Sequence, residues 1–406
     1  MKIAFDKVNV TPNQPCFMAG YSRREKSQGV LDPIEINTVA AEIGNEVYIL
    51  GILDSIMVEE SFCARVRERV SEQLGLSLEH ITVSAIHTHS APSFFKMTFE
   101  DNQVEEELTQ TVQEEMGRSM IRAYNAMEEC EPVLEKTEIQ GLYGNRNVKD
   151  GVQDKRVYLF GFYNKEKKLL GALFNISAHP TILDGSSFLL SADLLGHIRG
   201  EFQQILGCPV AVTNGCCGDV STRFYRRLSG REELEFTARQ VVEQFMDKKK
   251  ACPLYGGPVE SRTFDIVSHF EARTDEDWRQ MSEEVQHIQS PMKEFLSQRL
   301  RLKESFGAYD LAMIGQLRLF GNVLLVVLPG DVLSGFGNQI KNAFPGLEVV
   351  IICYSNTYCN YLVPREEYGK YFETYNSRLA RGEADRFIEE VIRQAKELIE
   401  ASGHRD

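Results

Sequence analysis

Short apolar runs alternate with longer helical segments along all 406 residues of the chain. Residues 46–53 (EVYILGIL) and 81–86 (ITVSAI) have the composition of strands, and residues 59–74 between them carry apolar side chains at helical spacing. Strands that alternate with helices form sheets whose faces the helices cover. This order therefore predicts an α/β fold.

The alternation continues to the C-terminus. The pattern also predicts helices over 104–127, 192–206, 230–250 and 383–401, strands over 209–213 and 348–353, and hairpins that pair 155–163 with 169–177 and 316–320 with 323–328. Residues 275–306 are rich in Glu, Gln, Arg and Lys and are expected to form a helical insertion or lid. Because no repeat, low-complexity tract or linker marks a boundary, we expect residues 1–406 to form a single domain.

Charge and cysteine content narrow the class of protein. Acidic residues outnumber basic ones by 59 to 45, and the net charge of −14 disfavours nucleic acid and anionic lipid as partners. No run approaches the roughly 18 apolar residues that a membrane span requires. Nine cysteines without C-x-x-C spacing, and a charged N-terminal segment unlike a secretion signal, favour the cytoplasm. The oligomeric state has no signature in the sequence.

Histidines follow two apolar strands at the point where each strand ends. The segment ITVSAIHTHS carries His87 and His89, which the two-residue period of a strand places on one face, and His179 ends the segment GALFNISAHP. Strand ends are where α/β enzymes build their sites. Metal binding and a pair of hydrogen-bonded histidines at a strand edge both fit this pattern.

A glycine-containing turn, NGCCGDVST, follows the strand at 209–213 and presents Ser221. Small residues allow backbone N–H groups to face an oxyanion, and they leave the hydroxyl available for attack. The turn does not match G-x-S-x-G, and a purely structural loop also fits. Cys216 and Cys217 within it are expected to be buried, inert thiols.

Two later segments add further polar groups after strands. Residues 328–331 (LPGD) end in Asp331, and residues 354–368 (YSNTYCNYLVPREEY) are unusually rich in tyrosine. Two imidazoles, one carboxylate and one phenolate form a ligand set suited to a zinc-like cation with one position left for water.

In this order the segments resemble the catalytic domain of the neutral ceramidase family, zinc-dependent N-acylsphingosine amidohydrolases. The resemblance extends from residue 18 to residue 368, and its strongest parts are HTHS at 87–90, GDVS at 218–221 and N-x-Y-x-x-Y at 356–361. It implies central mixed β-sheets flanked by helices, a bound Zn²⁺, a small-molecule or lipid-like N-acyl substrate and a place in lipid metabolism.

The resemblance also implies a set of metal ligands. Zinc would be held by His87, His179, Asp331 and Tyr361. Asp331 stands where the family has glutamate in its Pro-Gly-Glu segment, and it is one methylene shorter.

Four further residues acquire catalytic roles from the same resemblance. Ser221 matches the nucleophile, His89 lies beside the substrate, Arg146 positions the reacting groups, and Tyr371 is matched to the tyrosine that stabilises the oxyanion. The implied reaction is hydrolysis of an amide, in which zinc activates water and Ser221 attacks the acyl carbon.

Three departures from the family keep other functions open. The family's Gly-x-His near the N-terminus is Gly29-Val-Leu31 here, Ser221 is followed by Thr222 and Arg223, and no segment corresponds to the C-terminal β-domain of the long ceramidases. The alternatives are an esterase or lactonase acting on another small molecule, and a binding protein on a degenerate hydrolase scaffold.

Overall fold

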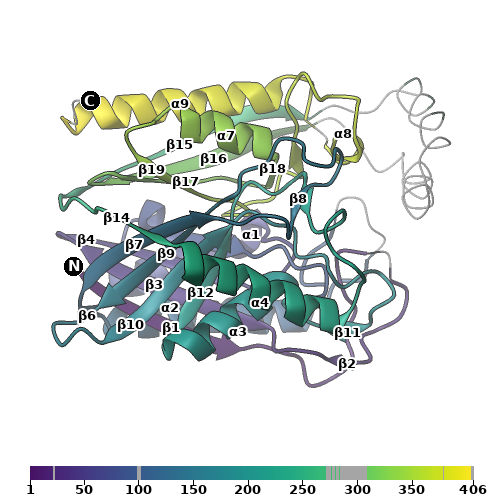
Figure 1. The fold of residues 1–406 in the computed structure, drawn as a ribbon, viewed down its shortest axis with the longest axis horizontal. Helices are drawn as coiled ribbons and strands as arrows, with labels where there is room; N and C mark the ends of the chain where they lie inside the picture. Colours follow the sequence, from purple (N-terminus) through teal and green to yellow (C-terminus); the bar gives the residue numbers. More distant parts are fainter. Residues whose placement is uncertain are drawn as a thin grey trace.

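The structure is a computed structural model that describes residues 1–21, 23–97, 102–270, 309–377 and 379–403, together with Glu276, Arg279 and Glu283. Three large mixed sheets and the helices that cover them make up an α/β fold, as the sequence predicts (Figure 1). The expected helical insertion at 275–306 lies outside the described residues, apart from those three.

The first sheet has the strand order β5-β4-β3-β1-β6. Its strands are β1 (Lys2–Asn9), β3 (Glu35–Ile43), β4 (Glu46–Leu53), β5 (Ile81–Ala85) and β6 (Glu128–Glu129). Only β4 and β5 pair in parallel, and β5 leads directly to His87. Helices α1 (Glu60–Leu74) and α2 (Glu106–Asn125) pack against this sheet.

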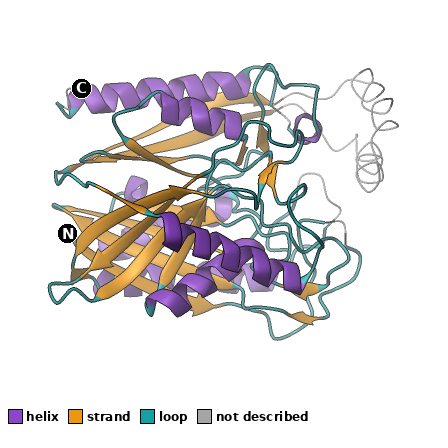
Figure 2. Ribbon diagram, viewed as in Figure 1, coloured by secondary structure: helices purple, strands orange, loops and turns teal. Residues whose placement is uncertain are grey.

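The second sheet has the order β12-β10-β9-β7-β14. Its strands are β7 (Glu131–Glu138), β9 (Arg156–Tyr163), β10 (Leu169–Ile176), β12 (Val210–Asn214) and β14 (Lys250–Cys252). β9 and β10 form the predicted hairpin, and β10 pairs in parallel with β12. Helices α3 (Asp193–Leu206) and α4 (Arg231–Lys248) cover it (Figure 2). Phe202 and Phe245 of these helices pack against Phe174 of β10.

The third sheet has the order β15-β16-β17-β19. Its strands are β15 (Val259–Phe270), β16 (Tyr309–Phe320), β17 (Val323–Val327) and β19 (Glu348–Ile352). The second predicted hairpin is β16 with β17, and β17 pairs in parallel with β19. Helices α7 (Ser334–Asn342) and α9 (Glu383–Ala401) pack on this sheet, and they lie side by side in Figure 1.

Short elements complete the fold where the long parallel strands end. Three two-stranded sheets pair β2 (Gly29–Val30) with β11 (Leu189–Leu190), β8 (Gly144–Asn145) with β13 (Val220–Ser221), and β18 (Asp331–Val332) with β20 (Tyr361–Leu362). The 3₁₀ turn η1 (Leu78–His80) precedes β5, and α8 (Phe372–Asn376) follows β20. No helix within the described ranges is long and apolar enough to span a membrane.

A buried ion pair connects the helix layer of the second sheet to the first sheet. Both terminal nitrogens of Arg199 in α3 donate to the carboxylate of Asp54, which follows β4, each at 2.7 Å. Glu35 at the start of β3 lies 3.1 Å from the same guanidinium. Removing Asp54 deletes two buried charge-assisted hydrogen bonds and leaves Glu35 as the only carboxylate among these partners of Arg199, so this contact holds the two layers together.

We expect Asp54→Asn to lower the free energy of unfolding by about 3–5 kcal/mol, because Arg199 then loses its bidentate partner in a buried setting. Urea denaturation followed by circular dichroism measures this change. Arg118→Ala is the matched control, because Arg118 pairs with Glu114 and Glu115 on the solvent face of α2 and such exposed pairs contribute less than about 1 kcal/mol. Equal losses in the two variants would contradict the role given to Asp54.

Candidate metal centre and active site

Three histidine side chains converge at the ends of β5 and β10. The Nε2 atom of His87 lies 3.1 Å from that of His179 and 3.3 Å from that of His89. His87 has a left-handed backbone, with φ of 71°, so the chain turns there and does not continue as a strand. The two histidines of the HTHS segment thus reach one point by a turn, where the sequence predicts strand periodicity.

Each of the three rings is oriented by a backbone carbonyl on its other nitrogen. The Nδ1 atom of His87 lies 2.6 Å from the carbonyl oxygen of Ile56. The Nδ1 atom of His89 lies 2.9 Å from the Gly20 oxygen, and that of His179 lies 2.6 Å from the Cys217 oxygen. A carbonyl only accepts hydrogen bonds, so each Nδ1 carries the proton and each Nε2 presents a lone pair.

Burial keeps these imidazoles neutral. Desolvation lowers the pKa of His87 to about 3 and holds the pKa values of His89 and His179 well below the ordinary range. Neutral imidazole is the form that ligates metals. Three lone pairs that face one another repel, and a cation between them removes that repulsion.

A buried carboxylate joins the three histidines. Asp331 Oδ1 lies 3.3 Å from His87 Nε2 and 3.8 Å from His179 Nε2. Tyr354 donates its hydroxyl proton to Oδ1 at 2.5 Å, and Tyr358 donates to Oδ2. Burial raises the pKa of Asp331 to about 7, although the two hydroxyls oppose that rise.

Gly330 fixes the approach of Asp331 to the cluster. It has a φ of 65°, and a Cβ atom there would lie 2.5 Å from the Asn360 carbonyl oxygen. Any other residue would be strained and would push β20 away from β18. Gly330 therefore allows the backbone to approach β20 closely enough to place the Asp331 carboxylate beside the histidines.

The donor set fits a divalent metal ion. The Nε2 atoms of His87, His89 and His179 lie within 4.8 Å of one another, and imidazole together with carboxylate is a ligand set that zinc accepts. The carbonyls on each Nδ1 are the outer partners that metal-binding histidines normally have. The structure thus places His89 inside the cluster, although the sequence assigns it beside the substrate.

Tyr361, which the sequence assigns as a fourth ligand, contacts a buried arginine. Arg146 donates from Nη2 to the Tyr361 hydroxyl at 3.0 Å and from Nε to Glu373 at 2.7 Å. Asn147 donates to the other carboxylate oxygen of Glu373 at 2.8 Å. Because β18 and β20 pair Asp331 with Tyr361, the tyrosine lies next to the carboxylate along the sheet.

Ser221 belongs to the same framework as Arg146 and His179. It pairs with Gly144 in the β8–β13 ribbon, two residues before Arg146, and the neighbouring Val220 carbonyl accepts the His179 backbone N–H at 2.9 Å. The sequence predicts an exposed hydroxyl on a turn. The structure differs, because Ser221 lies in a two-residue strand and is only 5% exposed. Its Oγ accepts the Arg223 N–H at 3.2 Å.

Tyr371 is half-buried immediately before α8. Its side chain makes no hydrogen bond to another described residue, and its role in holding an oxyanion stays a prediction. The buried thiol of Cys217 has a pKa raised well above the ordinary value by desolvation, as an inert cysteine should. Its carbonyl orients His179, and its sulfur lies 3.0 Å from the Tyr354 hydroxyl.

Some site residues have weak signals or none in the sequence. Tyr354 and Tyr358 belong to the tyrosine-rich segment, but nothing in that segment indicates that both donate to Asp331. Glu373 has no motif around it and is found only through its contact with Arg146, 227 residues earlier in the chain.

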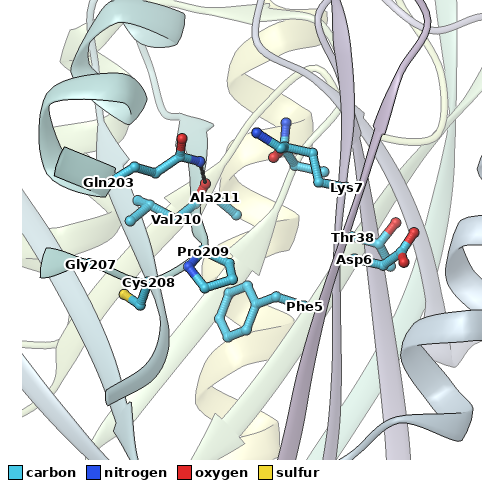
Figure 3. A pocket seen from close by; sticks show the side chains of 11 residues that line it. Phe5, Asp6, Lys7, Thr38, Gln203, Gly207, Cys208, Pro209, Val210 and Ala211 are labelled. Carbon is cyan, nitrogen blue, oxygen red and sulfur yellow. Dashed lines mark hydrogen bonds between the residues drawn. The ribbon is translucent and has the colours of Figure 1, made fainter. Parts of the chain in front are cut away.

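A separate cavity of about 340 Å³ lies away from this centre. Figure 3 shows Phe5 and Lys7 of β1 on one side and Gln203, Pro209 and Ala211 on the other. None of the residues that line it belongs to the histidine cluster.

Comparison with known proteins finds matches among solved structures. No family model and no curated protein sequence matches the chain. Among solved structures, the neutral ceramidase from Pseudomonas aeruginosa is similar with a TM-score of 0.77 and 16% identity, covering 98% of this chain and 74% of that one. A ceramidase complexed with C2 is similar to the same degree and is covered to 75%. The chain thus has a neutral-ceramidase-like fold, as its sequence motifs suggest.

We expect the purified protein to contain about one equivalent of zinc, and His87→Ala and His179→Ala to lose it. Elemental analysis after dialysis against a chelator measures the content. His197→Ala is the control, because that ring lies on α3 and contacts Asp32 at 3.1 Å, outside the cluster. Full zinc content in His87→Ala would contradict the assignment.

Proposed function

We propose that the protein is a metal-dependent hydrolase that cleaves an N-acyl amide bond. The observation that supports this most strongly is the convergence of three neutral imidazoles and Asp331, on a neutral-ceramidase-like fold, with a serine held in the same framework. We also propose that the helices and strands described above form one hydrolase domain.

We infer that His87, His179, Asp331 and Tyr361 hold a zinc ion, with His89 adjoining it. When bound, zinc supplies Lewis-acid chemistry, which polarises an acyl carbonyl and lowers the pKa of water. The carbonyls on Nδ1 and the hydroxyls on Asp331 keep the ligands oriented before the substrate arrives.

Ser221 is the proposed nucleophile. Its Oγ forms a bond to the acyl carbon while its proton passes to a basic group of the site. The C–N bond then breaks, and the leaving amine takes up that proton. Water hydrolyses the acyl ester, which releases a carboxylic acid and restores the serine.

Arg146 is proposed to position the reacting groups. Glu373 balances its buried charge and fixes its Nε, so that Nη2 is directed at the Tyr361 hydroxyl. Tyr371, at the start of α8, is proposed to donate to the oxyanion that forms on the acyl carbon.

The proposed substrate is a small or lipid-like N-acyl compound, handled in the cytoplasm as part of lipid metabolism. The sequence departures at Leu31 and after Ser221 leave an ester or a lactone as the competing substrate class.

Ser221→Ala is expected to reduce kcat by about a thousandfold or more while zinc content stays at the wild-type level, because only the nucleophile is lost. Turnover of an N-acyl amine and elemental analysis on the same preparation test both parts. Ser186→Ala, which removes an exposed hydroxyl bonded to Asp184, should change neither quantity. Normal turnover in Ser221→Ala would indicate direct attack by water.

The bond specificity is tested with matched pairs of N-acyl amines and esters that share one acyl chain. We expect the protein to cleave the amide members with the higher kcat/KM when the two are compared by acid release. A consistent preference for esters or lactones across the panel would replace amidase by esterase or lactonase.

A further inference from the structure

An apolar cavity of about 170 Å³ lies between the inner faces of the three large sheets. Its walls include Ile3 and Val39 from the first sheet, Leu173 from the second, and Leu325 and Val350 from the third. Figure 1 shows the three sheets that contribute these residues. An engineered apolar cavity of about 150 Å³ is large enough to bind benzene, so this one can hold a hydrocarbon group of at least that size.

The cavity extends along the strands from their early residues to Thr213 and Ile352, which lie at or near the ends of β12 and β19. Tyr48 is near the start of β4, Val323 begins β17, and Val350 lies on β19. Asp331, in contrast, follows β17, and β4 pairs with the strand that leads to His87. None of the cavity residues belongs to the histidine cluster, so the cavity is a separate site.

One charged side chain lines this apolar space. Arg318 on β16 is only 8% exposed, and its hydrogen bonds run from Nη2 to the Glu79 carbonyl at 3.2 Å and to the Thr82 hydroxyl at 2.8 Å. Its guanidinium also lies 4.9 Å from the centre of the Tyr48 ring. All of these partners are neutral groups.

Arg318 differs in this respect from three other buried cations of the chain. Arg146 is paired with Glu373, Arg199 with Asp54, and Lys341 with Asp154. In the part of the chain that the structure describes, no carboxylate lies within ion-pair distance of Arg318, and its Nε and Nη1 donate no hydrogen bond. A buried charge without a counter-charge is costly, and a ligand can supply the missing one.

We propose that this cavity binds a carboxylic acid with an apolar chain, its carboxylate on Arg318 and its hydrocarbon between the sheets. Nη2 already donates to two protein groups, so the carboxylate would accept from Nε–H or Nη1–H in a charge-assisted hydrogen bond, which is about twice as strong as a neutral one. The apolar walls select against hydrophilic acids, because the chain must leave water to enter. Burial lowers the pKa of Arg318 to about 10, so the side chain is still charged at neutral pH.

The test compares three eight-carbon probes, octanoate, octan-1-ol and octylamine, by isothermal titration calorimetry. We expect saturable 1:1 binding of octanoate, about tenfold or more weaker binding of the alcohol, and none of the amine. Octylamine binding as tightly as octanoate in the wild-type protein would overturn the proposal, whatever the variants do.

Three variants locate the binding. Arg318→Gln should lower the affinity for octanoate to that for octan-1-ol. Ala41→Phe should abolish octanoate binding, because the larger side chain fills the cavity. Ala41→Phe should also keep amide turnover at the wild-type rate. His87→Ala should bind octanoate normally, which separates this site from the metal centre. The inference would be refuted if the affinity for octanoate fell in His87→Ala but stayed unchanged in Arg318→Gln and Ala41→Phe. That result would place the acid at the metal centre.

Discussion

The repulsion among three neutral imidazole nitrogens is the constraint on which the rest of the site depends. His87, His89 and His179 present their Nε2 lone pairs to one another, because each Nδ1 is held by a backbone carbonyl. Those carbonyls come from separate segments of the chain, so the arrangement exists only when the first and second sheets are assembled correctly. Protonation would relieve the repulsion, but burial opposes a charge on the rings. A bound cation would remove the repulsion among the Nε2 atoms without requiring that a buried ring be protonated.

Backbone strain is concentrated around the same centre. Tyr354, Asn356 and Asn360 adopt left-handed conformations with φ of 56°, 60° and 61°, as His87 does. Such conformations are unfavourable for a tyrosine and persist only where surrounding contacts fix them. At Tyr354 the contact is the hydroxyl bond to Asp331, and at Asn356 the side chain accepts the Val83 N–H. The chain from β19 to β20 is thus shaped to deliver tyrosine hydroxyls to a buried carboxylate.

Sequence patterns predict the regular elements better than the contacts among them. β4 and α9 have the bounds that their apolar periodicity indicates, and HTHS locates two of the three histidines. β7 is missed because charged residues fill its exposed positions and leave no continuous apolar run. The Arg146–Glu373 pair is missed for a different reason. Its members are brought together by the fold from 227 residues apart, and Glu373 has no local signal, although the family resemblance singles out Arg146.

The strands of the three sheets border two different kinds of buried region. Where the parallel strands end, chain turns place polar side chains such as His87 and Asp331 in one buried cluster. Along the strands, the inner faces must be apolar if the sheets are to pack together. Arg318 is an exception to this rule. Its neutral partners accept hydrogen bonds from Nη2 only, and they do not balance its charge. A sequence that needed only packing at this position would place an aliphatic residue there, because replacing a buried charge by an apolar side chain is often stabilising. The guanidinium retained at this position is the group to which we propose that the carboxylate of a ligand binds.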